Sequence, residues 1–318
     1  MEAQKTAYRG KHFSIPTFSK EGGVCFQPET KLVQTIFAPD SPIVQTFNQP
    51  YDLKNFQVAR KPLSLGILPP EERLILAADN SSPRTLDMPI KFPYTDVRVP
   101  PELAAEVPII KRACNAMAAA NRAFYDACYL YYTLERGMVI AGNLQREAPC
   151  HVDGFQGARW HPKHVANHTI TVSNAVPTAY YVQPFDFDLL DVAKHDFYWE
   201  MNYQVQQSDS QFAWLPEDCE MTMMDGYTVH RGTATLVDLF RKFMRLSWET
   251  RIFDRLGNAH NPLFDYEWEM VPRDIEALNL VAFHADSDPS LRVFPHQNLD
   301  GSAKERGTAK TQPNLRKN

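Results

Sequence analysis

A series of short strand-like runs in the second half of the chain constrains its fold more than any other feature. Between Gly137 and about residue 284, brief runs of β-favouring residues alternate with polar or proline-bearing turns. The runs are GMVIAGNLQ, HTITVSN, TAYYVQPF, MTMMDGYTVHRG and FRKFMRLSWETRIF. Many short strands in series favour a sandwich or a barrel. We therefore expect a mainly β protein with flanking helices.

The residues before this region divide into two parts. Residues 1 to about 100 are rich in proline, and runs such as LVQTIFA and ERLILAAD between turn-forming clusters predict strands and loops with little helix. From Pro108 to Arg136, alanine, leucine and long side chains indicate a long helix that ends at Gly137. Apolar residues at helical spacing give this helix one face to lay against a sheet, namely Ala118, Phe124, Cys128 and either Tyr131 or Tyr132.

The last part of the chain differs in composition. Residues 299–318 contain almost no apolar side chains and several basic ones, which is typical of a disordered tail. We expect residues 1–298 to form a single domain. Its first hundred residues leave two uses open, a lid over a site or the interface of a homodimer.

Charge and cysteine usage bound the environment and the partners. A net charge of -5 gives no general reason to expect nucleic acid or an anionic membrane as a partner. The N-terminus lacks the apolar core of a secretory signal, and no run approaches the roughly 18 apolar residues of a membrane span, so we expect a cytoplasmic protein. Five scattered cysteines without a CxxC pair fit neither a disulfide framework nor a zinc knuckle, which predicts reduced and mostly buried thiols.

Several common chemistries lack their motifs in this chain. The sequence contains no GxGxxG after a strand, no Walker loop, no GxSxG elbow and no HExxH helix. Nucleotide-dependent, serine-hydrolase and zincin functions therefore lose their main support.

A histidine and an aspartate stand two residues apart in the segment CHVDGFQGARW, at His151 and Asp153. In a β-strand, residues i and i+2 point to the same face, so one imidazole and one carboxylate can bind the same ion. His230 ends the strand-like run GYTVH, where a neighbouring strand can bring it beside the first pair. Two imidazoles and one carboxylate leave positions open on a metal, as in non-haem iron(II) oxygenases. A hydrogen-bonded surface pair is the alternative interpretation of the tripeptide alone.

Two arginines follow His230 in the predicted strand FRKFMRLSWE. Alternation places Arg241, Phe243, Arg245 and Ser247 on one face, and Lys242, Met244, Leu246 and Trp248 on the other. Two arginines on one face are costly to bury without anions, and the planar guanidinium suits a carboxylate. The strand therefore indicates an anion site, with an edge strand bearing solvated arginines as the alternative.

The order H-x-D, then His, then Arg, after a long helix and an irregular N-terminal region, resembles the Fe(II)/2-oxoglutarate-dependent dioxygenases. The resemblance covers about residues 137 to 255, and the segments HVDGFQG and DRLGNAHNP are similar to motifs of the same class. It implies a double-stranded β-helix, a cupin-like jelly roll, over residues 137–284, buttressed by the helix at 108–136. It also implies that His151, Asp153 and His230 bind Fe(II), with 2-oxoglutarate and O2 as co-substrates.

The resemblance leaves the residues around the co-substrate open. An arginine about ten residues past the second histidine favours Arg241 for 2-oxoglutarate. The Arg-x-Ser pattern of some members favours Arg245 instead, at a longer spacing than those members use, so we expect Arg241 to bind 2-oxoglutarate and Arg245 to bind a substrate acid group or the same carboxylate. A hydroxyl or amide partner would come from Tyr180, Tyr181 or Gln145, although aromatic strand residues are more often part of a core. Gln156 and Arg159 would line the substrate pocket or satisfy turn backbone groups.

The reaction implied is that of an oxidoreductase, a hydroxylase that acts on an unactivated C–H bond and releases succinate and CO2. Halogenating relatives have a small residue where this chain has Asp153, so hydroxylation is favoured, with desaturation or ring formation as alternatives. A guanidinium at Arg245 that is not used by 2-oxoglutarate suits a carboxylate, and we therefore expect a small substrate such as an amino acid or a related acid. A protein side chain or a modified nucleobase is a weaker alternative, and nucleic acid is disfavoured by the acidic net charge.

Three rival interpretations remain open. The first is an iron-only oxygenase of the cupin type, which needs no arginine for a co-substrate. The second is a non-catalytic jelly-roll binding protein. The third is a zinc site at His161, His164 and His168, but no cysteine or acidic residue joins them at a ligand spacing, so we expect a solvated loop there.

Overall fold

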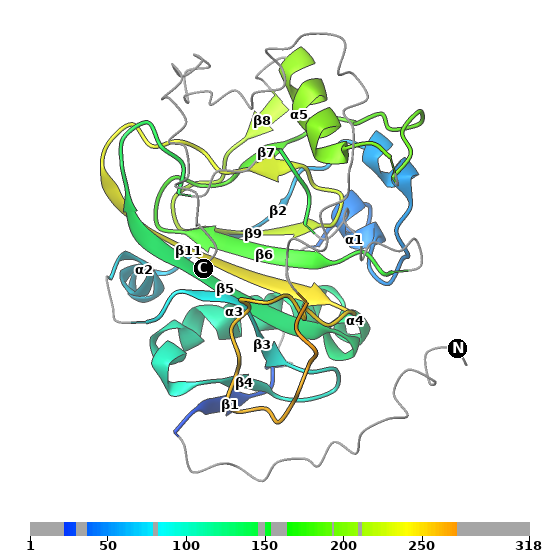
Figure 1. Ribbon diagram of the computed structural model, residues 1–318. Helices are drawn as coiled ribbons and strands as arrows, with labels where there is room; N and C mark the ends of the chain where they lie inside the picture. Colours follow the sequence, from blue (N-terminus) through cyan, green and yellow to red (C-terminus); the bar gives the residue numbers. More distant parts are fainter. Residues whose placement is uncertain are drawn as a thin grey trace, which may run out of the picture.

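The computed structural model describes residues 22–29, 37–78, 82–145, 150–153, 164–192, 194–208 and 212–271. This part of the chain is mainly β, with antiparallel sheets and a few helices (Figure 1). The tail expected at 299–318 and the last part of the expected strand region lie outside the described residues.

The larger sheet contains six strands in the order β2-β9-β6-β11-β5-β3. These strands are β2 Leu63–Ile67, β3 Thr85–Lys91, β5 Tyr129–Val139, β6 His168–Ser173, β9 Glu220–Asp225 and β11 Leu239–Glu249. The longest ladder joins β5 and β11, which pair antiparallel from Leu239 opposite Val139 to Glu249 opposite Tyr129. The first and last long strands of the expected strand region are therefore direct neighbours.

A smaller sheet faces the same cavity as the large one. It consists of β7 Ala179–Tyr181, β8 Ala213–Trp214 and β10 His230–Arg231, in the order β10-β7-β8. An isolated antiparallel bridge between His151 and His230 extends this sheet by one more segment. From β5 to β11 the chain thus visits the large, small, large, small, small, large, small and large sheets in turn. A separate pair is formed by β1 Val24–Phe26 and β4 Val97–Val99.

The helices cover the outer faces of the sheets. They are α1 Pro42–Gln45, α2 Pro70–Ala77, α3 Val107–Ala120, α4 Arg122–Ala127 and α5 Phe197–Gln207, with 3-10 turns η1 Leu53–Gln57 and η2 Pro101–Glu106. Figure 1 shows α3 and α4 against the large sheet and α5 beside the small one. The main apolar core lies between α3, α4 and the large sheet, and a second core lies under α5.

The long helix expected over residues 108–136 is wrong in its second half. Helix α3 ends at Ala120, and the Asn121 side chain caps the short α4 by accepting a hydrogen bond from the backbone of Phe124. Residues 129–139 then form β5, whose first seven residues are all buried. A strand buried on both faces loses the apolar-polar alternation that identifies strands, so its tyrosines and leucines fitted a helical spacing as well.

The run ERLILAAD also differs from its expected strand, because it lies largely in helix α2. Pro70 occupies the first turn, and Glu71 and Glu72 follow it at the positive end of the helix dipole. Glu72 forms an ion pair with Arg112 of α3 at 2.7 Å. These helix-start signals are stronger than the β propensity of the leucines and isoleucine that follow.

The two faces of β11 are those expected from its alternation. Met244, Leu246 and Trp248 are fully buried in the core on the helix side. Lys242 lies on the same side and forms an ion pair with Glu106 of η2 at 2.7 Å, with both side chains fully buried. The opposite face of the strand is therefore left for a cavity.

Two further expectations can be compared with the described residues. Four of the five cysteines are buried, Cys25 is partly buried, and none forms a disulfide. No helix among the described residues combines the length and the apolar character that crossing a membrane requires.

Candidate metal centre

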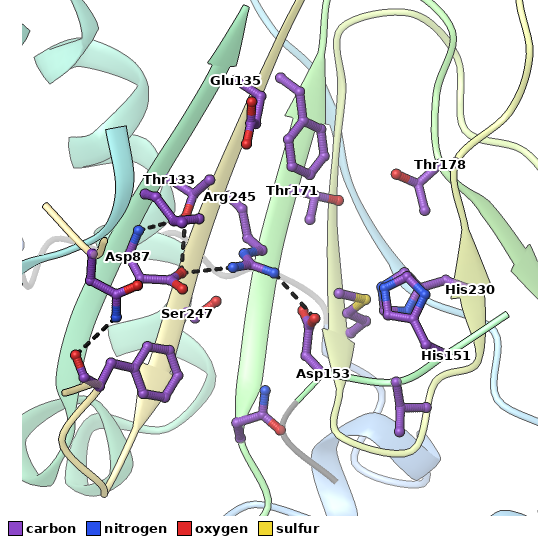
Figure 2. A pocket seen from close by; sticks show the side chains of 18 of the residues that line it. Asp87, Thr133, Glu135, His151, Asp153, Thr171, Thr178, His230, Arg245 and Ser247 are labelled. Carbon is purple, nitrogen blue, oxygen red and sulfur yellow. Dashed lines mark hydrogen bonds and ion pairs between the residues drawn. The ribbon is translucent and has the colours of Figure 1, made fainter. Parts of the chain in front are cut away.

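A cavity of about 420 Å³ lies between the two sheets. Arg241, Phe243, Arg245 and Ser247 of β11 line it, as the alternation predicts. Neighbouring strands of the large sheet add Thr133, Glu135, Thr171 and Met224, and His230 comes from the small sheet. Figure 2 shows the side chains of both sheets pointing into this space. The volume falls within the range of about 300–1,000 Å³ that is usual for small-molecule sites.

The three residues proposed as metal ligands meet at this cavity. One ligand atom from each of His151, Asp153 and His230 lies within 4.8 Å of the other two. The imidazole centroids of His151 and His230 are 4.5 Å apart, and Figure 2 shows the two rings side by side. The sequence spacing thus brings together two imidazoles and one carboxylate from segments far apart in the chain.

The backbone fixes which nitrogen of His230 can bind a metal. Its Nδ1 lies 2.9 Å from the carbonyl oxygen of Thr228. A carbonyl can only accept a hydrogen bond, so Nδ1 carries the proton and Nε2 keeps its lone pair. A histidine that ligates a metal usually donates its other N–H in this way, which orients the ring. The donor set of two imidazoles and one carboxylate fits a divalent ion such as Fe(II), with positions left open for other ligands.

Arg245 is paired with two carboxylates of the protein. Its Nη1 lies 3.1 Å from Oδ1 of Asp153, and its Nη2 lies 2.7 Å from Oδ1 of Asp87 (Figure 2). Burial alone would lower the pKa of Arg245, but the charges of Asp153 and Asp87 raise it above its ordinary value. The anions that the sequence requires for this arginine are therefore internal, and one of them is the candidate metal ligand.

The Arg241 side chain is held by hydrogen bonds to uncharged oxygen atoms. Its Nε donates to the backbone oxygens of Ala175 and Val176, at 3.1 and 2.9 Å, and its Nη1 donates to Oε1 of Gln145. Gln145 in turn donates from Nε2 to the backbone oxygen of Arg241 at 3.1 Å. Burial lowers the pKa of Arg241 to about 10. The more distant charges of Glu135 and Asp218 offset this effect only in part. Among the described residues no carboxylate forms an ion pair with Arg241, so this buried guanidinium lines the cavity without a direct anionic partner there.

The two tyrosines considered with the co-substrate point to different places. The hydroxyl of Tyr180 bonds to Thr171 at 2.7 Å and to Thr222 at 3.0 Å, and its ring lies 5.9 Å from that of His230. Tyr180 thus supports the cavity wall from behind Thr171. Tyr181 points the other way, into the core that contains Cys150 under α5, and does not line the cavity. Of the amide and hydroxyl candidates, Gln145 alone lies on the cavity wall.

Other residues singled out in the sequence are placed only in part. Gln156, Arg159 and His161 lie outside the described residues. The solvated loop expected for His168 is wrong, because this residue begins β6, is fully buried and stacks on Phe47 with ring centroids 3.9 Å apart. Its Nε2 lies 2.9 Å from the backbone oxygen of Ile43, which places it in the core and not in a zinc site.

Three residues of the site were missed by the sequence analysis. Thr133 and Glu135 line the cavity from β5, a segment that was assigned to a helix. Asp87 lies in β3, in the part of the chain where no site residue was expected. The run TLDMPIK, an acidic residue within an apolar strand, was the available signal for Asp87.

The comparisons with known proteins give only weak likenesses. No protein-family description matches the sequence, and no curated protein matches it. AviO1 from Streptomyces viridochromogenes Tue57 is 11% identical, with a TM-score of 0.35, over 62% of this chain and 92% of its own. EvdO2 from Micromonospora carbonacea var. aurantiaca, complexed with 2-oxoglutarate, is 13% identical with a TM-score of 0.32, over 64% and 83%. The non-heme monooxygenase ThoJ, a Ni complex, is 13% identical with a TM-score of 0.29, over 52% of this chain and 65% of its own.

Proposed function

We propose that this protein is an Fe(II)- and 2-oxoglutarate-dependent oxygenase with a double-stranded β-helix core. The order in which the chain visits the two sheets from β5 to β11 supports this core, since a jelly roll winds two antiparallel sheets in this alternating way. The function itself rests on the site, because likenesses as weak as those found carry no functional argument.

One observation carries the proposal. Within a single cavity, a cluster of two histidines and one aspartate lies together with Arg241, a buried guanidinium that has no carboxylate partner among the described residues. A buried cation is costly unless an anion joins it. A co-substrate that chelates the metal at one end and carries a carboxylate at the other supplies that anion. The sequence left Arg241 and Arg245 as alternatives for this role, and the pairing of Arg245 with Asp153 and Asp87 favours Arg241.

Each residue of the site has its own role in the proposed reaction. His151, Asp153 and His230 would hold Fe(II), which, together with 2-oxoglutarate, activates O2 for attack on an unactivated C–H bond when bound. Arg241 would bind the distal carboxylate of 2-oxoglutarate. Gln145 orients this arginine through one hydrogen bond to the guanidinium and one to the backbone oxygen of Arg241. Arg245 holds the Asp153 carboxylate in place. The cavity wall would shield the reacting groups from water once both substrates are bound. With Asp153 present in the cluster, hydroxylation with release of succinate and CO2 is the reaction proposed.

The substrate is proposed to be a small molecule that shares the cavity with 2-oxoglutarate. The expectation of an amino acid or a related acid rested on Arg245, whose guanidinium already contacts two carboxylates. Arg251, which also lines the cavity, forms an ion pair with Glu249 at 2.8 Å. Because these two cations are neutralised internally, neither requires an acidic substrate, and a neutral polar substrate is proposed.

The test uses the visible metal-to-ligand charge-transfer band of an Fe(II)–2-oxoglutarate complex. Protein freed of metal would be given Fe(II) and 2-oxoglutarate without oxygen, as wild type, His151→Ala and Arg241→Ala. We expect a band in wild type, no band in His151→Ala, and a band in Arg241→Ala only at much higher 2-oxoglutarate. His260→Ala and Arg122→Ala serve as controls, because both side chains are exposed and neither lines the cavity.

The alternatives predict other results. An iron-only oxygenase of the cupin type binds Fe(II) but gives no band with 2-oxoglutarate, and Arg241→Ala spares its activity. A non-catalytic binding protein gives neither the band nor release of succinate. Either result in well-folded wild type would overturn the proposed function.

A further inference from the structure

Asp87 occupies a strained position in β3. Its φ of 46° lies in the left-handed region, which is uncommon for residues other than glycine but is tolerated by aspartate and asparagine. The pairing of β3 with β5 shifts register between Thr85 and Met88, so Asp87 lies in a bulge. Bulges redirect side chains next to functional sites. Here the bulge turns a carboxylate of an edge strand into the cavity.

The Asp87 carboxylate is held from two sides. Thr133 donates from Oγ1 to Oδ1 of Asp87 at 3.0 Å, and the backbone N–H of Asp87 donates back to the same hydroxyl at 3.1 Å. Thr133 lies directly opposite Arg245 in the ladder between β5 and β11. A series of side-chain contacts therefore runs from Thr133 to Asp87, then to Arg245 and then to Asp153 (Figure 2).

The charges along this series of contacts alternate, from Asp87 to Arg245 to Asp153. Arg245 next to Asp153 would by itself repel a divalent cation and draw the carboxylate toward the guanidinium. Asp87 lies on the other arm of the same guanidinium and balances its charge. With Asp87 in place, the group of Asp153, Arg245 and Asp87 carries the same net charge as a single carboxylate. Such outer contacts to a metal-binding carboxylate orient the ligand and tune its affinity.

We propose that Asp87 is a positioning residue of the metal centre: acting through Arg245, it fixes the Asp153 carboxylate and balances the positive charge beside it. This inference rests on the proposed function only for the metal centre and does not depend on 2-oxoglutarate. It also accounts for the positive φ of Asp87, because strained backbone persists where the surrounding structure and the site require it.

The experiment measures metal affinity in the absence of co-substrate. Mn(II), which does not react with oxygen here and is visible by electron paramagnetic resonance, would be titrated into metal-free wild type and Asp87→Asn. Asparagine keeps the size of the side chain and tolerates the positive φ. We expect the dissociation constant for Mn(II) to rise about 10- to 100-fold, the range for lost outer contacts of a metal ligand. Asp126→Asn is the matched control, since it makes the same change of charge at a carboxylate that is paired with Arg122 and does not line the cavity.

A double-mutant cycle tests the route through Arg245. In the Arg245→Met background, which removes the guanidinium, Asp87→Asn should have little further effect on Mn(II) affinity. Thr133→Val removes the hydroxyl that holds Asp87, and a severalfold loss of affinity is expected from it. That variant takes the place of Asp87→Asn if the latter does not fold by circular dichroism.

The outcomes separate the two proposals. Wild type that binds Mn(II), with Asp87→Asn or Thr133→Val binding equally well, overturns the role of Asp87 and leaves the proposed function standing. An equal loss in Asp126→Asn also overturns it, because the effect would then be one of general charge. Wild type that binds no divalent ion overturns the metal centre itself.

Discussion

The backbones of His151 and His230 exchange both of their hydrogen bonds, each N–H donating to the other carbonyl at 2.9 Å. This bridge sets the two imidazoles beside each other without a metal. It also means that a bound ion ties together the same two segments that the bridge joins.

Metal binding should therefore stabilise the fold. At a free ion concentration of 100 times the dissociation constant, the free energy of unfolding should rise by about 2.7 kcal/mol. His230→Ala should remove this increment, since the metal loses one of its three protein ligands. Thermal unfolding with Mn(II) and with a chelator measures the difference. His260→Ala, an exposed histidine, should keep the wild-type response, and a metal-induced gain that survives in His230→Ala would contradict the assignment.

Gln145 should affect co-substrate binding through Arg241 alone. Gln145→Leu removes two hydrogen bonds to Arg241, one of them to its guanidinium. Hydrogen bonds to charged groups contribute about 1.5–3 kcal/mol, so we expect the concentration of 2-oxoglutarate that half-saturates the charge-transfer band to rise about tenfold or more. Affinity for Mn(II) should stay at its wild-type value. A parallel loss of metal affinity would show that Gln145 acts on the whole site.

The buried pair of Lys242 and Glu106 should matter for stability. Lys242→Met leaves the Glu106 carboxylate buried without its cation, and breaking such a pair typically costs about 3–5 kcal/mol. The double variant Lys242→Met/Glu106→Leu should recover most of this loss, because no buried charge is left. Urea unfolding measures both. Arg122→Ala breaks an exposed pair and should cost less than about 1 kcal/mol.

His168 should give the fold a pH dependence in the acid range. Burial lowers the pKa of His168 below its ordinary value of 6.5. Below pH 6.5 the unfolded chain therefore binds a proton that the folded state excludes, and stability falls as the pH drops, by up to about 1.4 kcal/mol per pH unit. Above pH 6.5 this contribution is fully present. Comparing urea unfolding of wild type and His168→Gln between pH 7 and 5, with a shallower slope expected for the variant, checks this; equal slopes would refute it.

The sequence predicted those features that depend on local alternation or on spacing. The H-x-D spacing and the later His230 identified the cluster of two histidines and one aspartate. The alternation along β11 separated Arg241 and Arg245 from Lys242. Assignment of β5 failed because burial on both faces gave it no alternation. The role of Arg245 could not be predicted, since its partner Asp87 lies far away in the sequence and enters the cavity only through a bulge.

The pairing of β5 with β11 has a consequence for how the protein is made. The chain from β5 to β11 supplies most of the residues that line the cavity, and these two strands form the longest ladder of the large sheet. Contacts between segments so far apart in sequence form late, because the loop between them must close first. Since a ribosome releases the N-terminal strand first, β5 must wait for β11 before its long edge is paired. Formation of the cavity is therefore a step that follows synthesis of β11, and the unpaired edge of β5 is the segment that a chaperone would have to shield until then.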